Sequence, residues 1–341
     1  MLSCAVTLVS GRAEADGLLD RYIVSSDTGI EQTPVRIPEG VAFDPVRGDF
    51  YATGVFGGRI TRIDGATGEE ETFFQDSPLT AFIGIKIAPL RRVAWVCTLD
   101  QSAGLEEPVS NVYAIGLRGS GQGELLRSFE LPTPFFCNDL ALDLAGDAYV
   151  TNSVGSAIMK IDARGLWDMS VEAEVFVDSP LLAPPVPYAG GLALGMNGIA
   201  VTPDNQFVIV ARNSPTQLFR ISRREPSRIE AIITEGDGLA QVPNPAGGAP
   251  LQLGIDGIVF VQGKLYTVLG SAMQQLDFLR FSRFGRATVS TRVDVPFGIT
   301  TATNAYGRLY VVDSEIHAAV PGAGLPIELP HSIVYVDAAE F

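Results

Sequence analysis

Four polar residues open short apolar segments that lie far apart in the sequence. Each is an acid or an amide and is followed by Gly or Asp, as in Asn197-Gly198. Carboxylate and amide oxygens together suit a hard divalent cation, calcium first and magnesium or manganese next. Zinc is disfavoured because the set contains neither Cys nor His. The four predicted metal ligands are Glu39, Asn138, Asn197 and Asp256.

These residues can act together only if the fold brings their segments side by side, and a sequence repeat predicts that it does. A unit of three short strands recurs: an opening strand, a turn rich in Gly, Pro and Asp, a second strand that ends in small polar residues, and a third, alternating strand. Period-two alternation between such turns is the hairpin signal. The six opening strands begin at Glu39, Ile83, Asn138, Asn197, Asp256 and Phe297.

The spacing of the units predicts an all-β fold, a six-bladed β-propeller. A unit averages about 52 residues, which suits a propeller blade with long loops. The inner strands of all blades line a central channel, so their first residues meet at one mouth. Packing alone would place apolar residues there, as at Ile83 and Phe297. Because buried carboxylates without a counter-charge are costly, a cation is expected among the four polar residues, with water or substrate completing its coordination.

The ends of the chain are predicted to close the ring. Only three strands are evident in the last unit, and the segment from Leu18 to Ser26 reads as a strand before the first blade. We expect this N-terminal strand to be the outer strand of the last blade. A closed ring contains no linker, because a cut would expose unpaired strand edges. The sequence therefore predicts one propeller domain over residues 17–341, preceded by a tail or degenerate signal-like segment over residues 1–16.

From residue 38 to about residue 337 the chain resembles the SMP-30, gluconolactonase and LRE-like family, which includes diisopropylfluorophosphatases and related lactonases. The resemblance implies that the four polar residues bind the catalytic metal, usually calcium, and that Asp256 also serves as general base or nucleophile. Asp256 and Glu39 are the predicted catalytic residues. The matching stretches are Pro38-Glu39-Gly40, Phe136-Cys137-Asn138-Asp139, Met196-Asn197-Gly198-Ile199-Ala200-Val201 and Ile255-Asp256-Gly257.

The reaction that this combination implies is metal-dependent hydrolysis of a lactone, an ester or a similar small molecule. The cation would polarise a carbonyl or phosphoryl oxygen, while Asp256 deprotonates a water molecule or attacks directly. A competing Ser-His-Asp triad is not indicated, because the chain has two histidines and no Gly-x-Ser-x-Gly motif.

The predicted substrate is apolar. Sugar-lactonase members of the family carry an arginine two residues before the Asn of the third blade, where this chain has Phe136. The long, nearly charge-free segments 179–196 and 236–255 are either a lid over such a molecule or ordinary loops packed over blade edges. His317 is a candidate for the second, structural calcium site of organophosphate-hydrolysing relatives. The candidate substrate-binding residues are Phe136, Asn152, Arg212, Asn213, Ser271 and Asp313.

Two other functions stay open. Propellers that resemble this family also act in biosynthesis, as strictosidine synthases or as cyclases of fungal secondary-metabolite clusters such as that for trichothecenes. The missing arginine and the apolar segments favour such a cyclase or isomerase, whereas the intact polar quartet favours hydrolysis. In the third alternative, a non-catalytic binding propeller, the metal only plugs the channel. Fold alone does not decide among the three.

Charge and composition exclude several classes of partner. The chain has 24 Lys and Arg against 39 Asp and Glu, a net charge of −15, which repels nucleic acid and anionic lipid. Its 46% hydrophobic and 18% charged residues describe a globular protein with a large core. The longest apolar run near the start is too short for a membrane span, and no protein partner is implied.

Cysteine usage and the first residues favour a cytoplasmic over a secreted protein. Cys4, Cys97 and Cys137 are an odd number at spacings that match neither a zinc motif nor a disulfide framework, so we expect buried thiols. The opening apolar run lacks a basic region, and Arg12 and Glu14 lie where small residues should precede cleavage.

Overall fold

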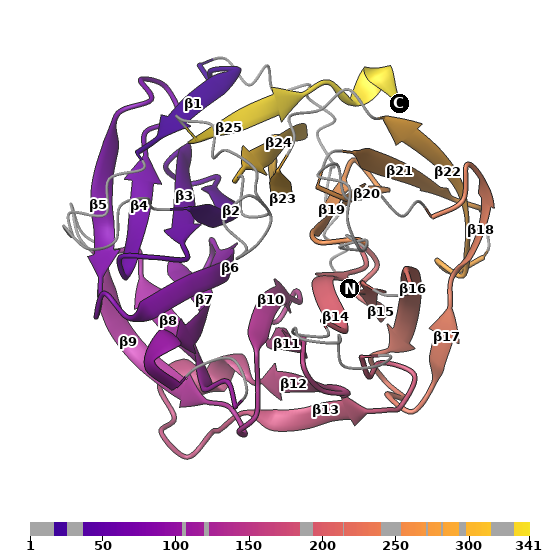
Figure 1. Ribbon diagram of the computed structural model, residues 1–341, viewed down its shortest axis with the longest axis horizontal. Helices are drawn as coiled ribbons and strands as arrows, with labels where there is room; N and C mark the ends of the chain where they lie inside the picture. Colours follow the sequence, from indigo (N-terminus) through magenta and orange to yellow (C-terminus); the bar gives the residue numbers. More distant parts are fainter. Residues whose placement is uncertain are drawn as a thin grey trace, which may run out of the picture.

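The computed structural model describes residues 17–25, 37–103, 107–118, 123–184, 194–213, 215–239, 254–270, 272–280, 282–292, 298–314 and 331–341. Their strands form six sheets, arranged as blades around a central channel (Figure 1). The predicted all-β, six-bladed propeller is therefore confirmed. The predicted tail, residues 1–16, lies outside the described residues. No helix in the described ranges has the length and apolar character needed to cross a membrane.

Each blade is a meander that runs outward from the channel. Blade 1 contains β2 (Pro38–Asp44), β3 (Asp49–Gly54), β4 (Arg59–Ile63) and β5 (Glu70–Gln75). Blade 2 contains β6 (Thr80–Ala88), β7 (Val93–Asp100), β8 (Ser110–Gly116) and β9 (Glu124–Glu130). Blade 3 contains β10 (Cys137–Leu142), β11 (Ala148–Asn152), β12 (Ala157–Ile161) and β13 (Glu174–Asp178).

The second half of the ring follows the same plan with one addition. Blade 4 contains β14 (Met196–Val201), β15 (Phe207–Arg212), β16 (Gln217–Ser222) and β17 (Ile229–Ala231). Blade 5 contains β19 (Ile258–Val261), β20 (Lys264–Val268), β21 (Met273–Phe278) and β22 (Arg286–Arg292), and β18 (Ile233–Gly236) pairs in parallel with β22. Blade 6 contains β23 (Ile299–Ala305), β24 (Arg308–Asp313) and β25 (His331–Val336).

The N-terminal strand completes blade 6, as predicted. β1 (Arg21–Val24) pairs antiparallel with β25, with Arg21 opposite Val334. Tyr22 on β1 is fully buried and donates its hydroxyl to the carbonyl oxygen of Gly65 in blade 1, 2.7 Å away. The strand that closes the last blade is thus also fastened to the first blade.

Each junction between neighbouring blades holds its own hydrophobic cluster. A large side chain on the second strand of a blade packs against the inner strands of the next one, because the blades are twisted sheets stacked face to face. Trp95 of β7, for example, is fully buried with Leu140 and Val150 of blade 3. The corresponding residues at the other five junctions are Tyr51, Tyr149, Ile209, Tyr266 and Tyr310.

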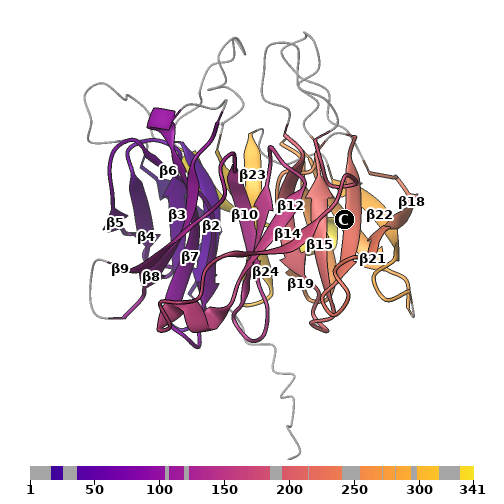
Figure 2. The same cartoon turned by 90° about the horizontal axis from the view of Figure 1, so that it is seen from below.

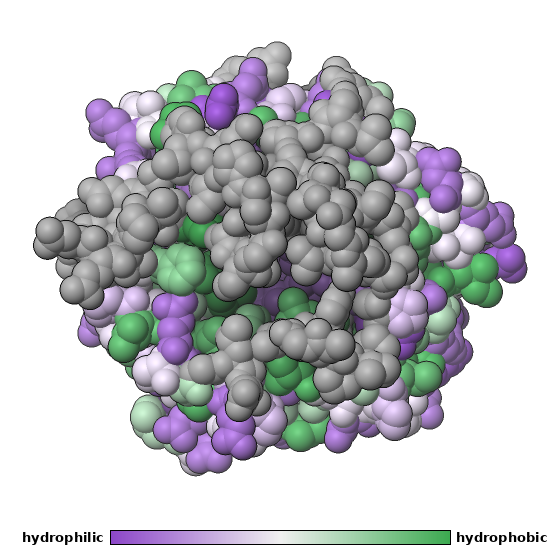
Figure 3. Space-filling view, in the orientation of Figure 1, coloured by the Kyte–Doolittle hydropathy of each residue, from purple (hydrophilic) through white to green (hydrophobic). Residues whose placement is uncertain are grey.

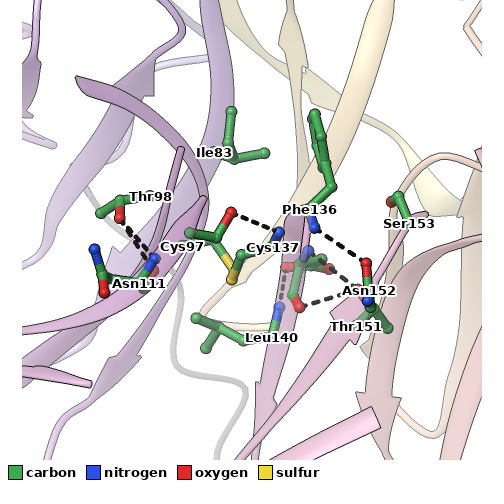
Figure 4. Close-up of a disulfide and its surroundings, with 12 residues drawn as sticks. Ile83, Cys97, Thr98, Asn111, Phe136, Cys137, Leu140, Thr151, Asn152 and Ser153 are labelled. Carbon is green, nitrogen blue, oxygen red and sulfur yellow. Dashed lines mark hydrogen bonds between the residues drawn. A yellow bond between two sulfur atoms is a disulfide. The ribbon is translucent and has the colours of Figure 1, made fainter. Parts of the chain in front are cut away.

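The prediction of buried thiols is wrong for two of the three cysteines. Cys97 on β7 and Cys137 at the start of β10 are fully buried and form a disulfide between blades 2 and 3 (Figure 4). They lie 40 residues apart in sequence but 5.3 Å apart between Cα atoms, because blade packing and not local spacing brings them together. Cys4 lies outside the described residues. Since disulfides persist in oxidising compartments and are rare in the cytosol, this pair favours a secreted over a cytoplasmic location.

Candidate functional site

The four predicted polar residues line one small cavity at the central channel. Glu39 of β2, Asn138 of β10 and Asn197 of β14 come from the starts of inner strands, and Asp256 lies just before β19. The cavity has a volume of about 10 Å³, room for about one water-sized sphere. The four predicted ligands thus come from four different blades and line the same space.

A β-bulge at the start of the inner strands of blades 1, 3 and 4 directs Glu39, Asn138 and Asn197 toward the channel. In β2 the ladder with β3 shifts register between Pro38 and Val41, so that Glu39 and Gly40 are left out of the regular pairing. The same shift leaves out Asn138 and Asp139 in blade 3. A bulge re-aims a side chain that a regular strand would alternate away. Equivalent shifts occur at Ile83-Gly84, Asn197-Gly198 and Thr300-Thr301.

The bulge corrects the predicted opening residue of the sixth blade. Its bulged pair is Thr300-Thr301, three residues beyond the predicted Phe297, and both threonines line the cavity. The Thr300 hydroxyl donates to the carbonyl oxygen of Glu39 at 2.7 Å, which ties blade 6 to blade 1. Phe297 itself lies outside the described residues. The sequence Phe297-Gly298-Ile299 resembles the opening segments of the other blades. The pairing of β23 with β24, however, sets the register of blade 6.

The glycine that follows an opening residue is required by close approach between blades and not by a turn. An added Cβ at Gly40 would lie 2.3 Å from the carbonyl oxygen of Ile83, and one at Gly198 would lie 2.6 Å from that of Asp256. Neither glycine has a positive φ, and both lie within strands. At these two junctions the backbone of one blade is therefore in direct contact with the opening residue of the next blade.

Residues opposite the bulges fix the same junctions from the second strands. Thr53 donates its hydroxyl to the carbonyl oxygen of Ile83 at 2.6 Å, and Thr151 donates to that of Asn197 at 2.8 Å. Cys97 occupies the equivalent position in blade 2, and its disulfide holds Cys137, the residue before Asn138. Between blades 2 and 3 the disulfide thus takes the place of the threonine hydrogen bond found at the other two junctions, next to the predicted ligand Asn138.

Two charged residues that sequence reasoning missed also line the cavity. Lys86 of β6 and Asp139 of β10 form an ion pair with 2.8 Å between Nζ and Oδ1. The Asp139 carboxylate is almost completely buried, whereas the Lys86 side chain is about a quarter exposed. The repeat contained a signal for both residues. Asp139 stands where blades 1, 2, 4 and 5 have a glycine, and Lys86 stands where blades 1, 3 and 4 have Ala42, Ala141 and Ala200. The two residues that depart from the repeat, Lys86 and Asp139, thus form an ion pair with each other.

The cavity is strongly acidic for its size. Glu39, Asp139 and Asp256 against Lys86 give its lining a formal charge of −2. Burial raises the pKa of Glu39 well above its usual range, and the neighbouring Asp256 and Asp139 carboxylates raise it further. Burial also raises the pKa of Asp256 to about 7, although a hydrogen bond from Asn197 acts in the opposite direction. Such carboxylates are stabilised by a proton or by a nearby cation.

A divalent cation fits this donor set. Two carboxylates and two amides offer only hard oxygen donors, the formal charge of the lining matches that of the ion, and the space is that of a single sphere. Within the described ranges no group of three or more His, Cys, Asp or Glu side chains is arranged to hold a metal. A cation at the channel would therefore depend on the amide oxygens of Asn138 and Asn197.

None of the predicted substrate-binding residues that the structure describes belongs to the lining of the cavity. The backbone N–H of Phe136 donates to Oδ1 of Asn152 at 3.0 Å (Figure 4), and that of Val154 donates to the same atom at 3.1 Å. Asn152 is buried, and its side-chain amide fixes the backbone conformation at Phe136, just before the first strand of blade 3. Phe136 is partly exposed beside Ile83, and both side chains extend to the same side in Figure 4.

The candidates in the other blades have similar supporting contacts. Asn213 accepts a hydrogen bond from the N–H of Gly254 at 2.5 Å, two residues before Asp256. Arg212 donates to the carbonyl oxygen of Leu181 at 2.9 Å and lies over the Phe219 ring. Asp313 pairs with Ile299 across the β23–β24 ladder, next to Thr300. Ser271 and His317 lie outside the described residues.

The surface above the cavity combines polar and apolar areas. Figure 3 shows a hollow near the centre of the propeller face, with hydrophilic residues inside it and hydrophobic residues on its described rim. Fold and site together define a six-bladed β-propeller with an acidic, oxygen-lined cavity at its central channel.

Solved structures with the same fold include proteins of several kinds. The Malassezia sympodialis allergen Mala s 1 has a TM-score of 0.64 and 16% identity, over 94% of this chain and 96% of that one. A calcium-binding protein, regucalcin, of Agrobacterium tumefaciens has a TM-score of 0.57 and 15% identity over 94% and 95%. A gluconolactonase of Xanthomonas campestris has a TM-score of 0.53 and 12% identity over 88% and 86%.

These similarities confirm the resemblance read from the motifs at the level of the fold. The chain shares its six-bladed architecture with a gluconolactonase and a regucalcin, and the match extends over most of each chain. No protein-family model and no curated protein matches the sequence.

Proposed function

We propose that this protein is a calcium-dependent hydrolase of an apolar lactone or ester. The observation that carries the proposal is the convergence of Glu39, Asn138, Asn197 and Asp256 from four blades on one cavity whose lining has a formal charge of −2. The calcium-binding and gluconolactonase propellers of the same fold add support for calcium and for ester chemistry. In this proposal magnesium and manganese are weaker substitutes.

The chemistry divides between the cation and the protein. A calcium ion held by the four oxygen-bearing side chains would polarise the carbonyl oxygen and stabilise the negative charge that develops on it. Asp256 is partly exposed and accepts the proton of a water molecule that attacks the carbonyl carbon, or attacks that carbon itself. The C–O bond between the carbonyl carbon and the leaving oxygen then breaks, and the leaving oxygen takes up a proton. Where Asp256 has attacked directly, a water molecule afterwards hydrolyses the anhydride formed on its carboxylate and frees Asp256. Glu39 is more deeply buried and its pKa is raised, so a bound calcium ion would be needed to keep it ionised as a ligand beside Asp256.

The residues at the rim favour an apolar acyl group in this proposal. Ile83 and Phe136 pack in the same cluster between blades 2 and 3, beside the strand that begins with Asn138. Their position would let an apolar substrate exclude water from the carbonyl group, which strengthens the electrostatic interactions there.

Calcium should stabilise the protein more at high pH than at low pH. The pKa values of Glu39 and Asp256 are raised in the folded, cation-free protein. Unfolding then releases protons, so the cation-free fold loses stability as the pH rises from about 4 through about 7. Bound calcium would neutralise the Glu39 and Asp256 carboxylates in place of those protons. In thermal unfolding, the increase in Tm with millimolar calcium should be larger at about pH 8 than at about pH 5. Equal increases at both pH values would contradict this linkage.

Metal content and product mass test the proposal directly. Elemental mass spectrometry should find about one calcium per chain in the wild type and none in a Glu39→Gln/Asp256→Asn variant that keeps the β-sheet circular dichroism spectrum. The wild type should open aliphatic lactones to products heavier by one water molecule. Absence of calcium from the calcium-treated wild type would overturn the proposal, and a product of unchanged mass would support ring closure instead.

A further inference from the structure

A second, larger pocket lies at the opposite end of blade 2 from the channel mouth. It is bounded by the β6–β7 turn, by the facing ends of β8 and β9, and by the short helical turn η2 (Ala163–Leu166) that follows β12 in blade 3. In Figure 2, η2 lies at the lower edge of the propeller, whereas η1 (Gln101–Ala103) lies at the upper edge. The pocket has a volume of about 450 Å³, a size typical of sites for small molecules.

The walls of this pocket expose large apolar side chains. Leu90 in the β6–β7 turn is 96% exposed, Trp167 is 64% exposed, and Leu126 of β9 is 44% exposed. Leu166 also lines the pocket and packs against the cluster between blades 2 and 3. Exposed apolar side chains gathered around one hollow mark a binding surface more often than isolated ones do. A ligand could remove much of this area from water.

Hydrogen bonds hold the segment that carries Trp167, one wall of the pocket, in place without a ligand. Arg127 of β9 donates to the carbonyl oxygens of Gly165 and Asp168, both at 2.6 Å, and to those of Met169 and Val171 at 3.1 and 2.5 Å. The segment that carries Trp167 is thereby tied to blade 2. A wall fixed in advance lowers the entropic cost of binding.

The pocket is also basic, although the protein as a whole is acidic. Arg91, Arg92 and Arg118 line it, against a single acid, Glu124. Asp44 already neutralises Arg92 through two hydrogen bonds of 2.6 and 2.7 Å. Arg91 lies over the Trp167 ring, with 5.2 Å from its guanidinium carbon to the ring centroid.

Arg118 is the cation best placed for a ligand. It is exposed and forms no ion pair with any residue that the structure describes. A guanidinium fork matches a carboxylate through two parallel hydrogen bonds. Because the net charge of the chain is −15, a singly charged carboxylate is repelled less than a phosphate dianion.

We propose that this pocket binds a small amphipathic carboxylate, with its apolar body between Leu90, Leu126 and Trp167 and its carboxylate on Arg118. The site is separate from the channel, so its occupation does not depend on the proposed hydrolysis. Its ligand class is a monocarboxylic acid with an apolar chain or ring.

Decanoate, below its micelle concentration, is a suitable probe because Trp167 reports on the pocket. The other tryptophan, Trp95, is fully buried. Decanoate should shift the tryptophan emission of the wild type in a saturable way, and Trp167→Phe should remove the response. Arg118→Glu and Leu90→Asp should each raise the half-saturating concentration by about tenfold or more. The matched controls Arg228→Glu and Leu279→Asp, at exposed positions on other blades, should leave it unchanged.

Three further comparisons decide the result. Decyltrimethylammonium, which has the opposite charge, should not compete with decanoate. The Glu39→Gln/Asp256→Asn variant should bind decanoate like the wild type, which separates this site from the channel. Equal effects of the pocket variants and their controls would overturn the proposal. It would also be overturned by a response to anionic vesicles without any response to dissolved decanoate, which would identify a membrane-docking surface.

Discussion

Replacing Asp256 with Asn is expected to lower the proposed hydrolysis by about a thousandfold, mainly in kcat. The amide keeps the shape and one oxygen donor of the carboxylate, so the cavity at the central channel is preserved. It cannot accept the proton from water, and it cannot attack a carbonyl carbon. Steady-state rates on an aliphatic lactone, measured with saturating calcium, report the loss.

The control for this variant lies in the same blade. Asp277→Asn changes an acid on β21 that is about half exposed and faces Lys264, far from the cavity lining. It should retain the wild-type rate and the wild-type Tm. If Asp256→Asn kept more than about a tenth of the activity, the role of Asp256 as base or nucleophile would be wrong.

Replacing Gly84 with Ala should damage both the stability and the cation affinity of the ring. The added Cβ would lie 2.7 Å from the carbonyl oxygen of Asn138 and 2.8 Å from the Cα of Asp139. Blades 2 and 3 must then move apart next to a proposed ligand, and the disulfide between them limits that movement. We expect a loss of about 1–3 kcal/mol in the free energy of unfolding and about tenfold weaker calcium binding.

Denaturant unfolding and titration calorimetry measure these two effects. Gly116→Ala in β8 is the matched control, because its Cβ would meet nothing closer than a Leu126 methyl group at 3.4 Å, an ordinary contact. That variant should unfold like the wild type. Wild-type stability and calcium affinity in Gly84→Ala would show that the contact between the two blades is not close enough to constrain the site.

The inner three strands of each blade could be predicted because they are long, apolar and separated by strong turn residues. Apart from the N-terminal strand of blade 6, the outer strands could not be predicted. β9 and β13, for example, expose most of their residues to solvent, so they carry no clear alternation of polar and apolar positions. Their existence depends on pairing with β8 and β12, which is a property of the folded sheet.

Within the site, the sequence predicted the residues that follow the repeat and missed those set by contacts between blades. Glu39 and Asn197 occupy the same position of equivalent units, so register alone brought them together. The Lys86–Asp139 ion pair, the Cys97–Cys137 disulfide and the position of Thr300 each depend on which residues face one another across a blade junction or a bulge. That information lies in three-dimensional packing, although departures from the repeat mark Lys86 and Asp139.

The closure of blade 6 by β1 also sets an order of events during protein synthesis. β1 leaves the ribosome early, but its partner β25 is made some 300 residues later, as the pairing of Arg21 with Val334 shows. Until then the first strand has no sheet to join, and blade 6, whose Thr300 donates to the carbonyl oxygen of Glu39, is incomplete. We therefore expect the channel cavity to become fully assembled late, because a nascent chain stalled before β25 has every proposed ligand but not the closed ring that holds them together.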